Sequence, residues 1–331
     1  MFRQIWICST LSLSLLLLKG QAQAEEIEMA QPTVSPHELT YSQHADWRHF
    51  FSFLAEDYVN FGRHMLNYSP QTYGAVAGTT LVLMPFDQKA RDELLTFSRR
   101  QHWLAGESQE RKVTGFSLFG KPQSVFLPRS PMGVFWYLGD GSTLVMTSAA
   151  FAAYGYSFGS YRSTQVSLQI LESLAIAGPT VLALKLATGR ESPAESTRTG
   201  GAWHGYPGLK AYTQNQAKYY SYPSGHTAAA VATWTVLVEN FPELTWLPAA
   251  RGTAAGLLML ALMNVGSHWP SDYPLAILIG YTSGKSVVAE HQARAQALSS
   301  KTAWHSGQWL WKGIEAHTEE LGLGLQTSWD F

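Results

Sequence analysis

The sequence predicts an all-α fold, with one large helical bundle that carries a small β-hairpin at its C-terminal end. Apolar residues make up 46% of the chain, and many of them gather in six separate runs. Glycine and alanine recur inside these runs, as they do where two helices approach closely. Without its leader the chain keeps about 300 residues, a length that suits one large domain.

Residues 1–24 read as a secretory signal peptide. Arg3 gives a basic start, residues 5–18 are apolar, and an A-x-A cleavage pattern ends at Ala24. A single N-terminal membrane anchor is the alternative, although the apolar run is shorter than the roughly 20 residues that a span needs. We therefore expect a periplasmic or secreted protein that is cut after Ala24.

Composition excludes several classes of function. The single cysteine, Cys8, lies in the leader, so the mature chain has no thiol for a disulfide, a thiolate metal site or a nucleophile. Loss of Arg3 and Lys19 changes the formal net charge from -1 to -3. Such a chain has no broad positive field for nucleic acid or an anionic membrane surface, so any attraction for phosphate must be local.

Six apolar runs are the expected core helices. They cover residues 73–86, 142–156, 171–187, 227–241, 252–265 and 275–288. Most are shorter than the ~18 uninterrupted apolar residues that indicate a membrane span, and polar residues such as Asn264 and Lys285 interrupt them. With a mean hydropathy of -0.08, the sequence favours a water-soluble bundle. A membrane protein with short spans is the alternative, and contact with a membrane surface is left open.

We place the helical core at residues 126–290 and expect residues 25–125 to wrap it with further helices. Within that wrapping segment, residues 87–123 are charged and predict a surface helix followed by a loop, with a solvated face because acids and bases are interspersed. A long loop rich in Gly, Ser, Thr and Pro covers residues 190–222. Loops of this length inside a compact domain are often lids or substrate contacts.

The C-terminal tail, residues 291–331, changes period. From Leu321 to Phe331 apolar residues alternate with polar or small ones, which is a strand pattern. Trp304, Trp309 and Trp311 precede it and suggest a partner strand. The sequence thus predicts a small hairpin that covers one end of the bundle. A strand aimed at an outer membrane is a weaker alternative, because one hairpin cannot close a barrel.

The clearest chemical signal is Pro223-Ser224-Gly225-His226 ahead of an alanine-rich run. It marks a helix start, where the Ser224 hydroxyl and the free amides of the first turn can meet an anion. His226 falls in that first turn. A histidine that donates a proton to the leaving oxygen is the expected general acid for a phosphate ester. A structural histidine at a helix start is the alternative.

A second histidine and a carboxylate follow about forty residues later, as His268 and Asp272. Asp272 comes just before Tyr273-Pro274 and can begin the next helix, since proline is tolerated in a first turn. A carboxylate that holds one ring nitrogen of His268 would leave the other nitrogen free to attack phosphorus. Metal ligation is the rival use of two histidines and an aspartate. It is less favoured, because the sequence lacks an i, i+4 histidine pair or a further acid near His226.

These residues resemble the superfamily of type 2 phosphatidic acid phosphatases, bacterial non-specific acid phosphatases and vanadium haloperoxidases. Its signature is KxxxxxxRP, then PSGH, then SRxxxxxHxxxD. The second motif is complete at residues 223–226, and the third keeps His268 and Asp272 with Ala261-Leu262 in the Ser-Arg position. The first runs from Lys185 to Pro193, with Ser192 in place of the arginine. The resemblance covers about residues 139–288.

The resemblance implies a helical bundle of that superfamily, with a phosphohistidine on His268, Asp272 as its orienting residue and His226 as the acid. Lys185 and the amides of Ser224 and Gly225 would bind the phosphate. The phosphatase branch requires no metal or other cofactor, whereas vanadate belongs to the haloperoxidases. The expected substrate is a lipid phosphate or a small phosphate ester. The sequence gives no oligomeric state.

The two replaced arginines leave two functions open. Removal of one charge-stabilising donor commonly lowers a rate about 10²–10³-fold. Arg190 is the obvious substitute, and cations of the long loop at residues 198, 210 and 218 are further candidates, although surface exposure is expected for each. His204 is expected to be an exposed loop residue. The first hypothesis is a periplasmic phosphatase, which retention of both histidines and the aspartate favours; the second is a catalytically impaired phosphate-binding or scaffold protein of the cell envelope.

Overall fold

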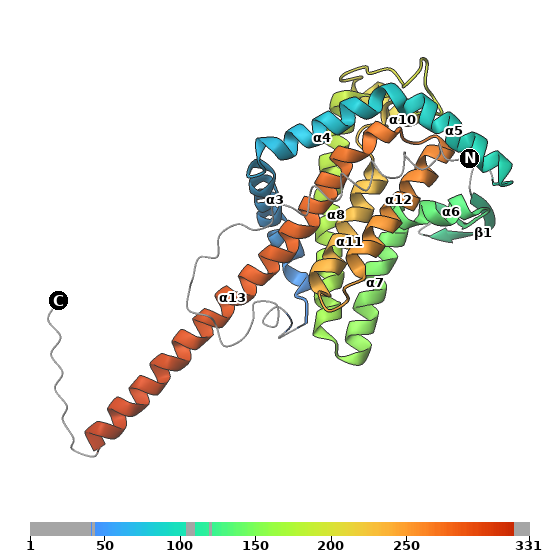
Figure 1. The fold of residues 1–331 in the computed structure, drawn as a ribbon. Helices are drawn as coiled ribbons and strands as arrows, with labels where there is room; N and C mark the ends of the chain where they lie inside the picture. Colours follow the sequence, from blue (N-terminus) through green and yellow to red (C-terminus); the bar gives the residue numbers. More distant parts are fainter. Residues whose placement is uncertain (1–40, 42–43, 104–109, 119–120, 321–331) are drawn as a thin grey trace.

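The computed structural model describes residues 41, 44–103, 110–118 and 121–320 (Figure 1). The predicted signal peptide and the predicted last strand lie outside the described residues. The described chain is a bundle of helices with one two-stranded sheet, which confirms the all-α prediction.

The elements follow one another with short connections, except for the long loop before α11. In chain order they are η1 (Trp47–His49), α3 (Phe50–Leu66), α4 (Pro70–Leu83), η2 (Met84–Phe86), α5 (Asp87–Arg100), β1 (Glu110–Leu118), β2 (Lys121–Pro128), α6 (Pro131–Trp136), η3 (Tyr137–Gly139), α7 (Gly141–Phe158), α8 (Tyr161–Thr188), α9 (Leu209–Gln214), α10 (Gln216–Tyr219), α11 (Gly225–Asn240), α12 (Leu247–Val265), η4 (Pro270–Asp272) and α13 (Tyr273–Glu320). All six predicted apolar runs are helical.

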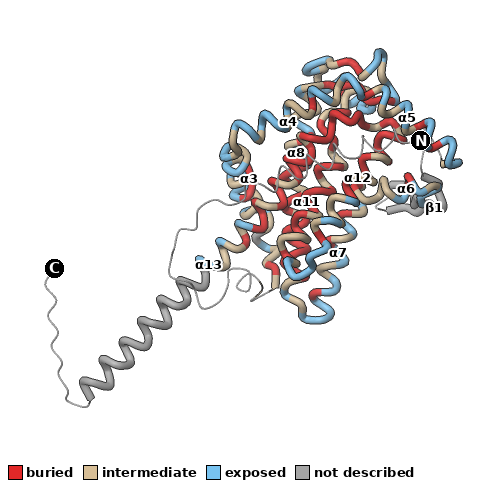
Figure 2. Tube along the Cα trace, in the orientation of Figure 1, coloured by how far each residue is buried: buried red, intermediate tan, exposed pale blue. Residues whose placement is uncertain are grey.

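The helix α11 lies at the centre of the bundle. It packs against α8, α12 and α13, and α7 packs on the outer side of α8. Figure 2 shows the buried residues concentrated along α8, α11 and α12. Gly280 and Gly284 of α13 allow the closest of these approaches, because a Cβ at Gly284 would lie 2.6 Å from the carbonyl oxygen of Ala232. Small residues in the apolar runs therefore mark close helix packing, as the sequence predicted.

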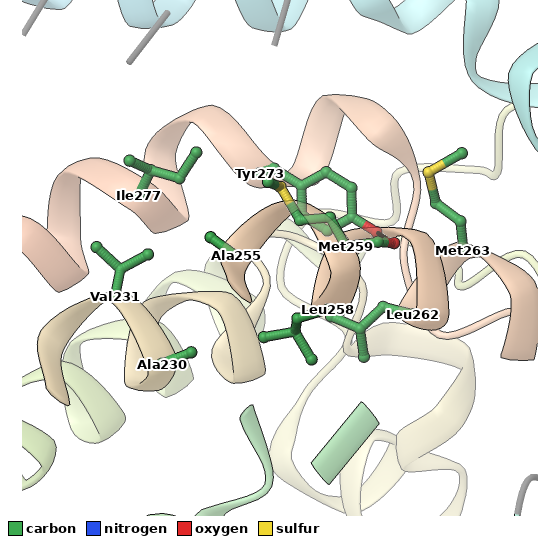
Figure 3. Packing of buried hydrophobic residues seen from close by; sticks show 9 residues of the cluster. All are labelled: Ala230, Val231, Ala255, Leu258, Met259, Leu262, Met263, Tyr273 and Ile277. Carbon is green, nitrogen blue, oxygen red and sulfur yellow. Dashed lines mark hydrogen bonds between the residues drawn. The ribbon is translucent and has the colours of Figure 1, made fainter. Parts of the chain in front are cut away.

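An apolar cluster joins α12 to its neighbours. Leu258 and Leu262 of α12 are fully buried, and Figure 3 shows them on the side of α12 that faces away from Tyr273 of α13. Full burial of a leucine side chain contributes about 2 kcal/mol. The Tyr273 hydroxyl donates a hydrogen bond of 2.8 Å to the carbonyl of Met259, so this large side chain is buried without an unpaired polar atom. The cluster fixes α12 and α13 at the end of the bundle where the chemical motifs lie.

Sequence signals set the ends of the motif-bearing helices. The Ser224 side chain accepts a hydrogen bond from the Thr227 amide and caps the start of α11. Gly189, at φ 53°, ends α8, and Gly266, at φ 84°, ends α12. Both glycines adopt a left-handed conformation that other residues rarely tolerate. The Lys185 end of α8, the His226 end of α11 and the loop that holds His268 are thereby brought together.

Two helices of the N-terminal segment cross this end of the bundle (Figure 1). The start of α5 and the end of α4 contact η4, and α5 also packs along α12. The Asn264 amide of α12 donates to the Ser98 hydroxyl of α5 at 3.2 Å. The wrapping segment expected from the sequence is therefore, in this part, a cover over the end of the core.

Two predictions about the remaining elements need correction. The end of the segment 87–123, expected to be a loop, instead forms part of an antiparallel hairpin of residues 110–118 and 121–128, with one irregularity in its register between Lys112 and Thr114. The partner strand expected around residues 304–311 does not form, because α13 continues as a helix to Glu320. The tail before Glu320 contains many good helix formers, and this local preference outweighs the aromatic residues that suggested a strand.

Within the described residues, one helix is long and apolar enough to cross a membrane. It is α8, with 28 residues, and 39% of its most apolar window is buried inside the bundle. A core helix of a soluble bundle meets the same criteria, so α8 is only a weak indication of membrane association.

Candidate active site

Four segments meet at the covered end of the bundle. They are the end of α8 with Lys185, the start of α11 with His226, the loop that holds His268, and η4 with Asp272. The rings of His226 and His268 lie 6.4 Å apart, centroid to centroid. The structure thus places the two predicted histidines next to each other, although 41 residues separate them in sequence.

His268 is fully buried and has one free ring nitrogen. Its Nδ1 lies 2.7 Å from the carbonyl oxygen of Ser221, and a carbonyl can only accept, so Nδ1 carries the proton. Its Nε2 is buried and has no partner among the described residues. Burial and the positive charge of Lys185 lower the pKa of His268 despite the opposing effect of Asp272. His268 is therefore a neutral imidazole with an available Nε2 lone pair.

Asp272 acts on this histidine mainly through a third residue. One carboxylate oxygen accepts 2.6 Å and 2.7 Å hydrogen bonds from the Ser221 hydroxyl and the Trp269 amide, and lies 3.6 Å from His268 Nδ1. Burial alone would raise the pKa of Asp272, but Arg190, His268 and these hydrogen bonds hold it below its ordinary value. Asp272 is an ionised, fixed carboxylate that holds Ser221, and Ser221 in turn orients the imidazole.

Arg190 corrects the expectation that it substitutes for a missing phosphate ligand. Its Nη1 donates to Asp272 at 2.5 Å and to the Ser271 hydroxyl at 2.7 Å. Its Nη2 donates to Asp87 at 2.5 Å and to the carbonyl of Gly200 at 2.9 Å. All four Nη hydrogens are thus engaged within the protein, and the side chain is 1% exposed. Arg190 thus binds the carboxylates of Asp272 and Asp87, and its Nη hydrogens are not available to a phosphate.

His226 faces the same space from the first turn of α11. The ring of Trp136 lies 5.2 Å from it, centroid to centroid. Burial, followed by the nearby His268 and Lys185, lowers the pKa of His226 to about 3. The imidazole of His226 is therefore neutral near pH 7. A bound phosphate dianion would oppose this positive field and favour the protonated form that a general acid requires.

The groups expected to bind an anion lie beside this histidine. A Cβ at Gly225 would lie 3.6 Å from Lys185 Nζ, so the lysine adjoins the start of α11. Burial lowers the pKa of Lys185 to about 8. The Ser224 amide, an expected phosphate donor, instead donates to the carbonyl of Asp272 at 3.1 Å, and its hydroxyl caps α11. The first-turn amides of Gly225 and His226 have no partner in the described part of the chain, as is usual at a helix start.

The long loop is held by a buried acid. Glu191 accepts hydrogen bonds from the Thr197 and Ala202 amides at 2.8 Å and 3.0 Å, and His204 Nε2 lies 2.9 Å from it. Despite its burial, these hydrogen bonds lower the pKa of Glu191 to about 2. His204 is 35% exposed and paired, so the expectation of a simple exposed loop residue was incomplete. Lys218 also approaches Glu191, at 3.9 Å.

Uncharged residues occupy the positions of the two replaced motif arginines. Leu262 lies in the apolar cluster of α12. Ser192 is buried, and its hydroxyl has no partner among the described residues. Sequence reasoning missed Ser221, Asp87 and Trp136, which belong to the site but to none of the three motifs. Only the nearness of Ser221 to the PSGH motif could have indicated its role.

Comparison with known families identifies one segment. The PAP2 superfamily model matches residues 167–295, a range that contains Lys185, both histidines and Asp272. No curated protein and no solved structure matches the chain. The match covers the segment that carries the motif residues, and it is consistent with the resemblance of residues 167–295 to the superfamily of type 2 phosphatidic acid phosphatases.

Proposed function

We propose that the protein hydrolyses phosphate monoesters through a phosphohistidine on His268. One observation carries this proposal. His268 is a buried neutral imidazole whose Nδ1 proton is held by the Ser221 carbonyl and whose Nε2 has no protein partner in the described chain. An unpaired buried nitrogen costs free energy and is expected where a ligand completes the site.

The first chemical step would transfer the phosphoryl group to the protein. The Nε2 lone pair of His268 attacks phosphorus, the P–N bond forms and the P–O bond to the leaving group breaks. His226, protonated in the presence of the phosphate, gives its proton to the leaving oxygen. The positive charge that develops on the imidazole lies close to the ionised Asp272, whose oxygen is 3.6 Å from Nδ1.

The second step would restore the protein. Neutral His226 takes a proton from a water molecule as that water attacks phosphorus, the P–N bond breaks, and inorganic phosphate leaves. His268 returns to its neutral form with the proton still on Nδ1. In both steps Lys185 and the free amides at the start of α11 would stabilise charge on the equatorial oxygens.

We also infer a substrate that reaches the site from the cell envelope. The predicted signal peptide supports a periplasmic location. Exposed apolar side chains at the site end of the bundle support a lipid phosphate and contact with a membrane surface. They are Leu81, Val82 and Phe86, which are 66%, 65% and 56% exposed. A small soluble phosphate ester is the other substrate class, and the two differ only in the leaving group.

A second function is favoured by the filled arginine positions. With Leu262 and Ser192 where the superfamily motifs carry arginine, a protein that binds phosphate without turnover would keep the same fold. The test is phosphate release by the purified mature chain from p-nitrophenyl phosphate and from a lipid phosphate, beside His268→Ala. Turnover that disappears in His268→Ala supports the phosphatase. Phosphate binding by a folded wild-type chain that releases no product supports the second function.

A further inference from the structure

Arg91 lies on the face of α5 that packs against the active-site loop. Along this face, Ser98 contacts Asn264 at 3.2 Å, and Asp87 accepts a hydrogen bond from the Ser271 amide at 3.0 Å. Arg91 lies one turn after Asp87, on the same side of the helix. Its Nη2 is 3.1 Å from the position that a Cβ at Gly266 would occupy. The surface helix expected from the sequence therefore directs an arginine towards the core.

The guanidinium of Arg91 lacks the partners that a structural arginine has. Its Nε is buried and has no hydrogen-bond partner in the described chain. Burial lowers the pKa of Arg91, with only a partial opposing effect from Asp92. Arg190 differs, because two buried carboxylates compensate it. A partly desolvated, unpaired guanidinium is costly unless an anion completes it.

Arg91 also lies where two loops of the site meet. The Ala194 amide donates to the Gly266 carbonyl at 3.0 Å, and the guanidinium contacts this junction. Two residues before Ala194 is Ser192, which occupies a motif-arginine position and has an unpaired buried hydroxyl. Two residues after Gly266 is His268, with its unpaired Nε2. Arg91 Nε, the Ser192 hydroxyl and His268 Nε2 thus belong to segments that meet at this junction or continue from it, and each lacks a partner among the described residues.

We propose that Arg91 binds the substrate phosphate and takes over the task of a replaced motif arginine. The inference rests on the proposed function, because it assigns a ligand to the same site. Arg91 lies outside the matched residues 167–295, so α5 would complete a site that this segment leaves short of positive charge. A phosphate monoester dianion, which Lys185 and Arg91 would neutralise together, fits better than a monoanionic diester.

The experiment compares Arg91→Met and Arg91→Lys with Arg100→Met, an exposed arginine of the same helix as control. Methionine keeps most of the apolar stem and removes the charge. Inorganic phosphate affinity is measured by calorimetry, and kcat/KM with p-nitrophenyl phosphate. We expect Arg91→Met to lose about 10²–10³-fold in kcat/KM. Arg91→Lys, which keeps the charge, should lose less, and Arg100→Met should match the wild type. Added guanidinium ion should partly rescue Arg91→Ala, which a packing role would not allow.

The outcomes separate this inference from the proposed function. If the wild type turns over and Arg91→Met keeps its kcat/KM and phosphate affinity, the role of Arg91 is wrong while the phosphatase stands. If the wild type only binds phosphate, a loss of affinity in Arg91→Met still supports the inference. A wild-type chain that neither binds nor hydrolyses overturns both. Should Arg91→Met fail to fold, the kcat/KM of Arg91→Lys and the rescue of Arg91→Ala by guanidinium ion test the role of Arg91 in its place.

Discussion

The buried ion pairs of Arg190 predict a large loss of stability when Asp87 becomes asparagine. Asp87 and Arg190 are 0% and 1% exposed, and their charged atoms lie 2.5 Å apart. Breaking such a pair costs about 3–5 kcal/mol, because one charge is left buried without its partner. Since Asp272 still pairs with Arg190, we expect the lower end, about 3 kcal/mol. For a domain of this size that lowers the unfolding midpoint by about 6–12 °C.

Thermal and urea unfolding, followed by circular dichroism, measure this effect. Asp92→Asn is the matched control, because Asp92 is an exposed acid of the same helix and should change stability by less than about 0.5 kcal/mol. Asp272→Asn removes the other carboxylate of Arg190 and should destabilise to a similar degree. Asp87→Asn and Asp272→Asn should differ in activity, since Asp272 also accepts a hydrogen bond from Ser221 and lies beside His268. A midpoint for Asp87→Asn equal to that of the control would refute the buried ion pair.

Three further predictions concern titration and proton transfer. His226→Gln should lower turnover of an alkyl phosphate by about 10²–10⁴-fold, because the alkoxide leaving group needs a proton. The same variant should keep the burst of product from 2,4-dinitrophenyl phosphate, since dinitrophenolate leaves without a proton. Stopped-flow absorbance measures the burst, and phosphate release measures the turnover. Because burial lowers the pKa of Lys185 to about 8, phosphate affinity measured by calorimetry should fall as the pH rises above that value, and Lys185→Gln should lose this dependence. Burial raises the pKa of Asp57 to about 6. Between about pH 4 and pH 6 the folded chain therefore keeps a proton on Asp57 that the unfolded chain has released. The free energy of unfolding should fall by up to about 3 kcal/mol as the pH rises through this range. Urea unfolding at several pH values should show this slope in the wild type and not in Asp57→Asn.

The helices that carry the site could be predicted because their sequence signals are local. The apolar runs, the Ser224 cap and the terminal glycines at 189 and 266 each act within a few residues of their own position. The same locality explains the errors. The hairpin at residues 110–128 depends on cross-strand pairing, and its residues up to 123 were expected to be a charged loop. The tail after residue 291 continues as a helix because its helix formers prevail over a few aromatic residues.

The site itself could be predicted only where residues belong to a motif. His226, His268 and Asp272 come together as expected, but the partners of Asp272 do not follow from spacing. Arg190 was expected to face a phosphate, and the structure turns it towards Asp87, a residue 103 positions earlier in the chain. Arg91 was expected on a solvated face, because nothing local indicates that α5 covers the loop of Gly266. The role of each of these charged residues depends on contacts with segments that are distant in the sequence.

The most direct test of the phosphohistidine is to trap it. Wild type and His226→Gln are mixed with 2,4-dinitrophenyl phosphate, quenched in base, where a phosphohistidine survives, and digested for mass spectrometry. We predict phosphate on the peptide that contains His268, with more in His226→Gln because hydrolysis of the intermediate needs the base. His268→Ala should carry none. Phosphate absent from His268 in both proteins, or product release by His268→Ala at the wild-type rate, would contradict the assignment of this histidine as the nucleophile.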